Sequence, residues 1–205
     1  MNPTLAYPFH GALYLNLTNR CQNDCTFCLR RHHEGVGGHR LWLAEEPSAA
    51  EVLAAVGDPR PFREIVFCGF GEPLLRVEVV AEVAAALKAR ASREGYPLRI
   101  RVDTNGLANA VHGRNVLPEL AGLVDAVSIS LNAPTAEQYE RLCRPTVPGA
   151  YAALLDFIRE AVACLPEVTL TAVAVPGVDL EACRRLAERL GAGFRVRGLI
   201  GEDAE

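Results

Sequence analysis

The chain has 205 residues, enough for one domain with a substantial core. Hydrophobic residues make up 50% and charged residues 22%, as in an ordinary globular protein, and no run approaches the roughly 18 apolar residues of a membrane span. The formal charge of −4 argues against nucleic acid or an anionic membrane as a partner. The N-terminus lacks the pattern of a signal peptide, and an odd number of cysteines, seven, suits a reducing compartment, so we expect a cytoplasmic protein.

Short β-branched runs alternate along the chain with segments of helical period. The expected strands cover residues 12–17, 64–68, 98–103, 126–131, 168–175 and 194–200, and the expected helices cover 48–56, 77–87, 117–121, 151–164 and 180–190. Ser48 and Glu51 have the spacing of a capping box. The alternation indicates a parallel sheet with right-handed crossovers. Because six units are too few to close an eight-stranded barrel, we expect a single domain, 1–205, with an α/β fold: a partial (β/α)6 TIM-type barrel open on one side. A flat doubly wound sheet is the alternative.

Three cysteines follow the first expected strand with the spacing C-x3-C-x2-C: Cys21, Cys25 and Cys28. A structural zinc site or a closed iron–sulfur site normally has four protein ligands. Three thiolates would therefore leave one coordination position open, and an open position allows chemistry. We assign residues 17–47 to this loop and its connection, and residues 1–11 to an N-terminal lead-in.

Glycine-rich or polar segments accompany the next three expected strands, at the edge where parallel α/β proteins place their sites. They are Gly69-Phe70-Gly71-Glu72-Pro73, Asp103-Thr104-Asn105-Gly106 and the segment that carries Ser128, Ser130 and Asn132. Glycine allows close backbone approach, and buried polar groups need partners that a ligand could supply. Each segment alone is also consistent with an ordinary turn. Their joint placement at one edge indicates a ligand site.

In these segments the chain resembles the radical SAM superfamily. The three cysteines match its C-x3-C-x-aromatic-C motif, with Phe27 at the aromatic position, and residues 69–73 resemble its Gly-Gly-Glu-Pro segment, with Phe70 in place of a glycine. Residues 128–132 resemble the serine segment of its fourth strand, and residues 103–106 are similar to the Asp-Thr-Asn-Gly of the glycyl-radical activating enzymes. A narrower resemblance, to the group associated with TatD-type hydrolases, rests on residues 14–30, 41–43 and 142–145.

This resemblance implies cofactors and their ligands. The cysteines would bind three irons of a 4Fe–4S cluster, and S-adenosylmethionine on the fourth iron would be cleaved reductively to methionine and a 5′-deoxyadenosyl radical that abstracts hydrogen from a substrate. The residues implied in cofactor binding are Phe27 at the adenine, Gly69, Phe70, Gly71 and Glu72 at the methionine amino group, and Asp103, Thr104, Asn105 and Ser130 at the ribose and methionine end, with Asn132 in the same set.

Partners and substrate are less defined. An electron donor of the flavodoxin or ferredoxin type is implied, as is association with a TatD-type hydrolase, and the substrate, a small molecule or a protein, stays open because a fold does not give a reaction. One alternative is a zinc site that adds His32 or His33 to the cysteines. Others are an iron–sulfur redox or partner module without S-adenosylmethionine cleavage, and a glycyl-radical activase, which residues 103–106 favour slightly.

Seven residues outside these motifs are also of interest. We interpret Cys68, Cys143, Cys164 and Cys183 as mostly buried small residues, with Cys143 as the exception because Arg144-Pro145 places it in a loop after the fourth strand. Arg144, Arg195 and Arg197 could bind a carboxylate. Arg195 and Arg197 share one face of the last strand, and the sequence does not say whether that face points inward.

Overall fold

The computed structural model describes residues 4–199. Seven strands form one sheet in the order β1-β2-β5-β6-β7-β8-β9, in which β1 is antiparallel to β2 and every other pair is parallel. The strands are β1 (Ala6–Phe9), β2 (Ala12–Leu15), β5 (Ile65–Phe67), β6 (Ile100–Thr104), β7 (Ala126–Ser130), β8 (Val168–Val173) and β9 (Gly193–Arg197). A separate hairpin joins β3 (Gly35–Val36) to β4 (His39–Arg40).

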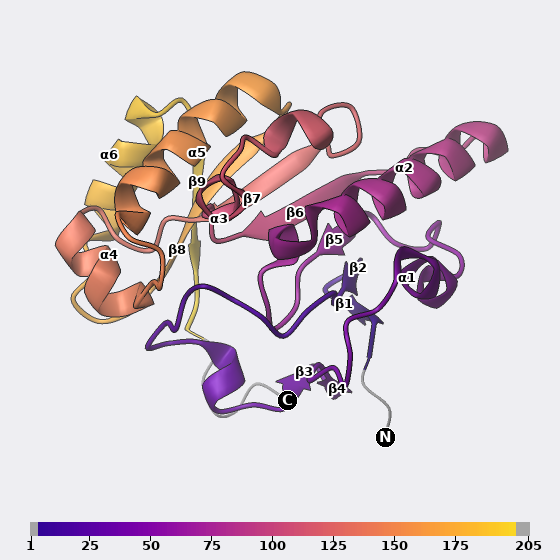
Figure 1. Cartoon of the computed structure of the whole chain (residues 1–205), viewed down its shortest axis with the longest axis horizontal. Coiled ribbons are helices and arrows are strands. Elements are labelled where there is room, and N and C mark those ends of the chain that lie inside the picture. Colours follow the sequence, from indigo (N-terminus) through magenta and orange to yellow (C-terminus); the bar gives the residue numbers. More distant parts are fainter. Residues whose placement is uncertain (1–3, 200–205) are drawn as a thin grey trace.

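Helices gather on one face of this sheet, and the loop after β2 lies with the small hairpin on the other side (Figure 1). The α-helices are α1 (Ala49–Val56), α2 (Val77–Glu94), α3 (Ala108–His112), α4 (Ala136–Cys143), α5 (Ala150–Cys164) and α6 (Leu180–Arg189). Three 3-10 helices are η1 (Leu29–Arg31), η2 (Pro73–Arg76) and η3 (Leu117–Glu119). The sheet does not close on itself, which confirms the predicted partial barrel. Among residues 4–199, no helix is both long and apolar enough to cross a membrane.

The core lies between the helices and one face of the sheet. Alternate strand residues such as Phe67, Val102 and Ile129 are fully buried there. The residues between them point to the opposite, concave face, as strand alternation requires. On β6 and β7 that face carries Asp103 and Ser128, which are direct neighbours in the register. The sheet therefore has one apolar and one polar face, and the polar face leads up to the cysteine loop.

Residues 1–11 were predicted as an N-terminal lead-in, and the structure corrects this prediction because the strand β1 lies within them. His10 and Gly11 have φ of +47° and +77° and make the tight turn that pairs β1 with β2. Pro8 hid the strand, because a proline cannot donate to a ladder and argues against a strand. In the structure Pro8 lies on an edge strand, where a missing N–H is tolerated.

Two helical predictions also needed correction. The helix predicted at 117–121 is only the short η3, with Pro118 in its first turn, where proline is tolerated. Helix α4 was not predicted, although Thr135 caps it by accepting a hydrogen bond from Gln138 N at 3.3 Å. The Thr-x-x-Gln spacing was the signal that could have found it. The last predicted strand is β9, and Ile200 at its predicted end lies outside the described residues.

The predicted capping box at α1 is confirmed and gives a stability test. Ser48 Oγ accepts a hydrogen bond from Glu51 N at 3.3 Å, and the Glu51 carboxylate accepts one from Ser48 N at 2.8 Å. We expect Ser48→Ala to lower the free energy of unfolding by about 1 kcal/mol, because it leaves helix N–H groups without an acceptor. Urea unfolding measures this, with Ser92→Ala on the exposed side of α2 as the matched control. An equal effect of both substitutions would contradict the capping role.

Candidate functional site

The cysteine loop follows the carboxyl end of β2, and hydrogen bonds from two of its own arginines to backbone carbonyls hold it together. Arg30 donates to the carbonyl oxygens of Asn19 at 3.0 Å and Asn23 at 3.1 Å. Arg31 donates to the carbonyl oxygen of Cys25 at 2.9 Å. These contacts fold the loop around the cysteines, although the sequence analysis gave neither arginine a role. Arginine suits this position because its fork of donors reaches two carbonyls at once.

The end of α4 holds one side of this loop. The backbone N–H of Asp24 donates to Cys143 O at 3.0 Å, and that of Thr26 donates to Leu142 O at 2.8 Å. Asn23 Nδ2 donates to the buried Tyr139 Oη at 3.1 Å. Cys143 is thus the buried last residue of α4, not a loop residue as predicted. It brings the Leu142–Pro145 motif against the cysteine loop.

The loop after β6 holds the other side. Asn105 Nδ2 donates to Gln22 Oε1 at 3.0 Å and lies 3.6 Å from Cys21 Sγ. Asn105 itself is fixed, because its backbone N–H donates to Glu72 Oε2 at 2.6 Å and its Oδ1 accepts from Leu107 N at 3.0 Å. Asn105 is therefore a predicted site residue that contacts one of the three loop cysteines directly.

Glu72 is a buried carboxylate that joins the ends of β5 and β6. Its Oε1 accepts hydrogen bonds from Thr104 Oγ1 at 2.7 Å and Leu74 N at 3.0 Å, while Oε2 accepts from Asn105 N. Burial raises the pKa of Glu72 to about 7, and the hydrogen bonds from Asn105, Thr104 and Leu74 only partly oppose that rise. The Glu72 N–H donates to Arg20 O at 2.8 Å, which ties the same residue to the start of the cysteine loop.

Gly71 allows this close approach of the two loops. A Cβ at position 71 would lie 2.3 Å from Thr18 O and 2.5 Å from Arg20 O, both of them backbone atoms that cannot rotate away. Gly69 is similarly crowded, because a Cβ at that position would lie 2.3 Å from Asn16 Oδ1, and its φ is +156°. The glycines of this segment are thus explained by packing of the chain against itself.

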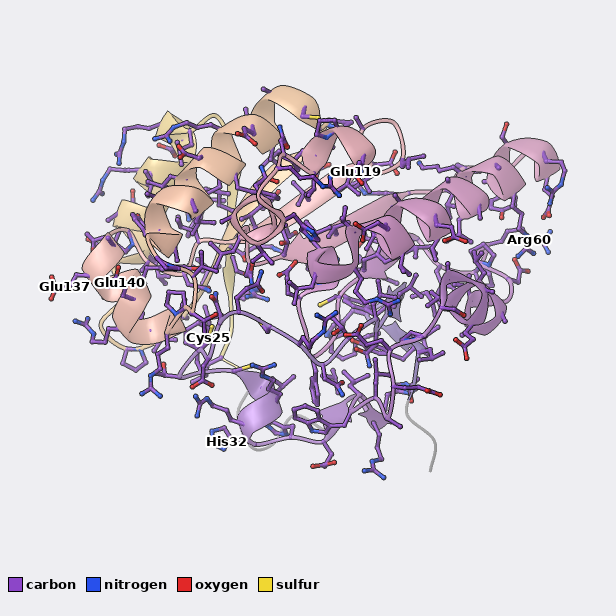
Figure 2. The ribbon with its side chains drawn as sticks, viewed as in Figure 1. Cys25, His32, Arg60, Glu119, Glu137 and Glu140 are labelled. Atoms are coloured by element: carbon purple, nitrogen blue, oxygen red, sulfur yellow. The ribbon has the colours of Figure 1, made fainter. Side chains whose placement is uncertain are left out.

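The cysteine thiols themselves do not converge on one point. In residues 4–199, no group of three or more His, Cys, Asp or Glu side chains is arranged to hold a metal ion, and this includes the zinc set with His32 or His33. Figure 2 shows His32 on the outer side of the loop, apart from Cys25. The Cys25 thiol instead lies beside that of Cys143, and this neighbour together with burial raises the pKa of Cys25.

Two observations nevertheless fit an iron–sulfur cluster with a polar ligand beside it: the set of thiols and the unpartnered polar atoms around them. The donor set is three free thiols in one loop, Cys21, Cys25 and Cys28. Burial raises the pKa of Cys21 to about 11 and also raises that of Cys28, which opposes thiolate formation, so iron would have to displace a proton from each thiol. Buried polar atoms around the loop, Gln22 Nε2, Asn23 Oδ1 and Asn132 Oδ1, find no partner among the described residues. To ligate iron, Cys25 would turn away from Cys143.

The remaining predicted site residues fall into two sets. Three line the concave face or the loop edge: Asp103 is ion-paired with Arg101, Ser130 Oγ accepts from Arg197, and Asn132 Nδ2 lies 3.7 Å from Cys143 Sγ. Two aromatic residues point elsewhere. Phe70 packs in a small apolar cluster with Tyr7 and Leu41, and Phe27 packs partly against the main core. The structure thus gives Phe70 a packing role that the sequence analysis missed.

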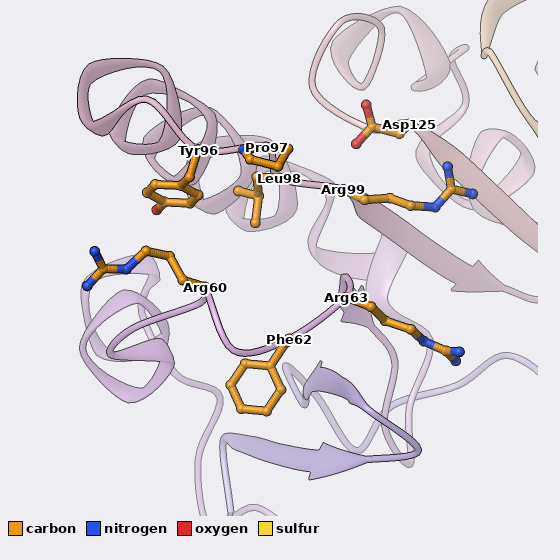
Figure 3. A pocket seen from close by; sticks show the side chains of 8 residues that line it. All are labelled: Arg60, Phe62, Arg63, Tyr96, Pro97, Leu98, Arg99 and Asp125. Carbon is orange, nitrogen blue, oxygen red and sulfur yellow. The ribbon is translucent and has the colours of Figure 1, made fainter.

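A cavity at the opposite end of the strands does not belong to this site (Figure 3). It measures about 440 Å³ and is lined by residues that precede β5, β6 and β7, among them Arg60, Tyr96 and Asp125. Charged residues that line this cavity already form ion pairs within the chain: Arg60 with Asp58 at 2.8 Å, and Asp125 with Lys88 at 2.7 Å. The cysteine loop lies instead at the carboxyl end of β2.

Known proteins share these features. The chain is 35% identical over 172 residues to GTP 3',8-cyclase of Corynebacterium glutamicum, which covers 82% of this chain and 42% of that protein. It is 33% identical over 152 residues to the dual-specificity RNA methyltransferase RlmN of Phenylobacterium zucineum, covering 64% of this chain and 34% of that protein. The chain therefore spans less than half the length of these relatives. Its fold matches that of Streptococcus suis SuiB bound to S-adenosylmethionine, with a TM-score of 0.66, 13% identity and coverage of 92% of this chain and 40% of SuiB.

The fold and the site define a class of protein: an open α/β barrel that carries a loop of three free cysteines at the carboxyl end of its first parallel strand. The sequence model of the radical SAM superfamily matches residues 15–190. The chain belongs to the radical SAM superfamily. Members of this superfamily use a 4Fe–4S cluster and S-adenosylmethionine, which are the cofactors predicted from the sequence.

Gly71 provides a test of the loop packing. We expect Gly71→Ala to lower the free energy of unfolding by about 1–3 kcal/mol, because its Cβ would overlap backbone oxygens of residues 18 and 20. It should also lower the iron bound per chain after reconstitution. Gly198→Ala is the control, since nothing lies within 4 Å of its Cβ position. Unchanged stability and iron content in Gly71→Ala would contradict the packing role.

Glu72 provides a pH test. Its folded-state pKa of about 7 lies above the ordinary value of 4.5, so its contribution to stability is complete below pH 4.5 and is lost as the pH rises through about 7. We expect the unfolding free energy of the wild type, minus that of Glu72→Gln, to fall by roughly 3 kcal/mol across this range. Chemical unfolding at several pH values measures it, and all other titrating groups cancel in the difference. A difference that is flat or rises with pH would refute the assignment.

Proposed function

We propose that the chain catalyses reductive cleavage of S-adenosylmethionine and directs hydrogen abstraction from a substrate. The single observation that carries this is the loop of three free cysteines held at the carboxyl edge of the open barrel by Asn105 and the end of α4. A bound 4Fe–4S cluster would supply the electron, and S-adenosylmethionine would supply the 5′-deoxyadenosyl radical. Cys21, Cys25 and Cys28 would hold the cluster.

The chain's own residues would orient the two cofactors. Asn105 fixes Cys21 and Gln22, and the Glu72 carboxylate fixes Asn105, so the cysteine loop keeps one place relative to β6. Asn132 has an unpartnered Oδ1 near the same edge, which suits an amino or hydroxyl group of S-adenosylmethionine. Glu72 already accepts three hydrogen bonds, so we propose that it acts by positioning and that the methionine amino group meets other acceptors.

We also propose that the chain falls in the group associated with TatD-type hydrolases. Support comes from the way the three motifs meet around the cysteine loop. Asn19 exchanges two hydrogen bonds with the backbone of Leu43, at 2.7 Å and 3.0 Å, and Thr26 N donates to Leu142 O. A TatD-type hydrolase is accordingly the proposed partner, and a flavodoxin- or ferredoxin-like protein the proposed electron donor.

The activase alternative rested on Asp103–Gly106. Contacts within the chain account for these residues, because Asp103 pairs with Arg101, Thr104 binds Glu72 and Asn105 contacts Cys21. The segment therefore does not require a protein substrate.

Anaerobic reconstitution with iron and sulfide tests the proposed reaction. With dithionite and S-adenosylmethionine, we expect the wild type to form 5′-deoxyadenosine and methionine, and Cys25→Ala to form neither. Cys164→Ala is the matched control, because Cys164 ends α5 and lies outside the loop. Chromatography of the products and iron analysis provide the measurement. A wild type that binds a cluster but cleaves no S-adenosylmethionine would support the redox-module alternative and refute this proposal.

A further inference from the structure

The last strand of the sheet, β9, carries two arginines, Arg195 and Arg197, to which the proposed reaction assigns no role. The parallel register places Arg195 beside Thr171, and Thr171 beside Ser130. The neighbours of these residues along β7 and β8, Ile129 and Leu170, belong to the core under the helices. Arg195 therefore points to the concave face, and Arg197, two residues on, shares that face. The face of β9 that carries Arg195 and Arg197 therefore points into the open barrel.

Arg197 reaches over the concave face. Its Nη2 crosses β8 and lies 3.4 Å from Ser130 Oγ, to which it donates a hydrogen bond. Burial raises the pKa of the Cys68 thiol, just after β5, to about 12, and the positive charge of Arg197 opposes that rise. The guanidinium thus lies between β9 and the middle of the open barrel.

Arg195 lines a cavity of about 430 Å³ on the same face. The lining contains four arginines, two glutamates and two hydroxyl residues: Arg63, Arg99, Arg101, Arg195, Glu64, Glu167, Ser128 and Thr169. Both glutamates are already matched, Glu64 with Arg101 at 3.2 Å and Glu167 with Arg99 at 2.7 Å. Within residues 4–199, Arg195 and Arg197 have no carboxylate at ion-pair distance, although Asp103 on the same face is paired with Arg101.

We propose that Arg195 and Arg197 form an anion-binding subsite that holds a carboxylate or phosphate group of the substrate. Each guanidinium carries a pair of parallel N–H donors that binds such a group bidentately, and the two arginines place two positive charges on one strand face. The cavity beside Arg195 extends towards the amino ends of the strands, away from the edge where Asn105 and Cys21 meet. Arg197 is the last residue of β9 and lies nearer the carboxyl edge, so the rest of an anionic substrate would extend from the arginines towards the edge where Asn105 and Cys21 meet. This inference rests on the proposed function, because it names the class of molecule that loses hydrogen.

Isothermal titration with inorganic phosphate tests the subsite. We expect the wild type to bind phosphate and the double variant Arg195→Gln/Arg197→Gln to bind it about tenfold more weakly, since two charge-assisted contacts are lost. Arg159→Gln is the matched control, because Arg159 lies on the outer helix α5 and pairs with Asp156 at 2.6 Å. Thermal melts establish that the variants fold. No phosphate binding by the wild type, or equal binding by the double variant, would overturn the subsite.

The methionine carboxylate of S-adenosylmethionine is the other source of such an anion. In reconstituted protein saturated with S-adenosylmethionine, we expect the phosphate affinity to stay within about twofold of its value without S-adenosylmethionine. Displacement of phosphate would assign the arginines to the cofactor and overturn the substrate role. Formation of 5′-deoxyadenosine by the wild type reports on the proposed function separately. Arginine-dependent phosphate binding without that product would contradict the proposed function alone.

Discussion

The site depends on one buried carboxylate, that of Glu72. It accepts hydrogen bonds from Thr104, Leu74 and Asn105, and its own N–H reaches Arg20. An ionised carboxylate is costly to bury, and only several donors make it tolerable. Glu72 therefore fixes three strand-end loops relative to one another. The position of the first cysteine follows from this arrangement through Asn105.

The second anchor of the cysteine loop is the end of α4. Backbone hydrogen bonds hold Asp24 and Thr26 there, while Cys25 lies against Cys143. The loop is thus held on two sides, by the loop after β6 and by the end of α4, and cluster binding would require the Cys25 side chain to turn away from Cys143. A loop whose backbone is fixed and whose cysteine side chains can turn is consistent with metal binding that displaces thiol protons.

Much of the fold and of the site's location was predictable from the sequence, because motifs at the ends of parallel strands meet at one edge of the sheet. That rule predicted the place of the cysteine loop beside the polar segments after the next strands of the parallel sheet. The match to the superfamily agrees with the predicted cofactors. The sequence could not show partners that only folding brings together. The three hydrogen bonds that Glu72 accepts within the chain could not be predicted, and Cys143 was placed in a loop although it ends a helix. Pro8 masked a strand because propensity argues against proline there.

The central claim is that three cysteines leave one iron of the cluster free for S-adenosylmethionine. Electron–nuclear double resonance of the reduced, reconstituted protein tests it directly, with S-adenosylmethionine labelled with nitrogen-15 at its amino group. The account predicts a hyperfine coupling between the cluster spin and the labelled nitrogen, which direct bonding to iron would produce. A cluster signal with no coupling to the label, and unchanged by S-adenosylmethionine, would contradict it.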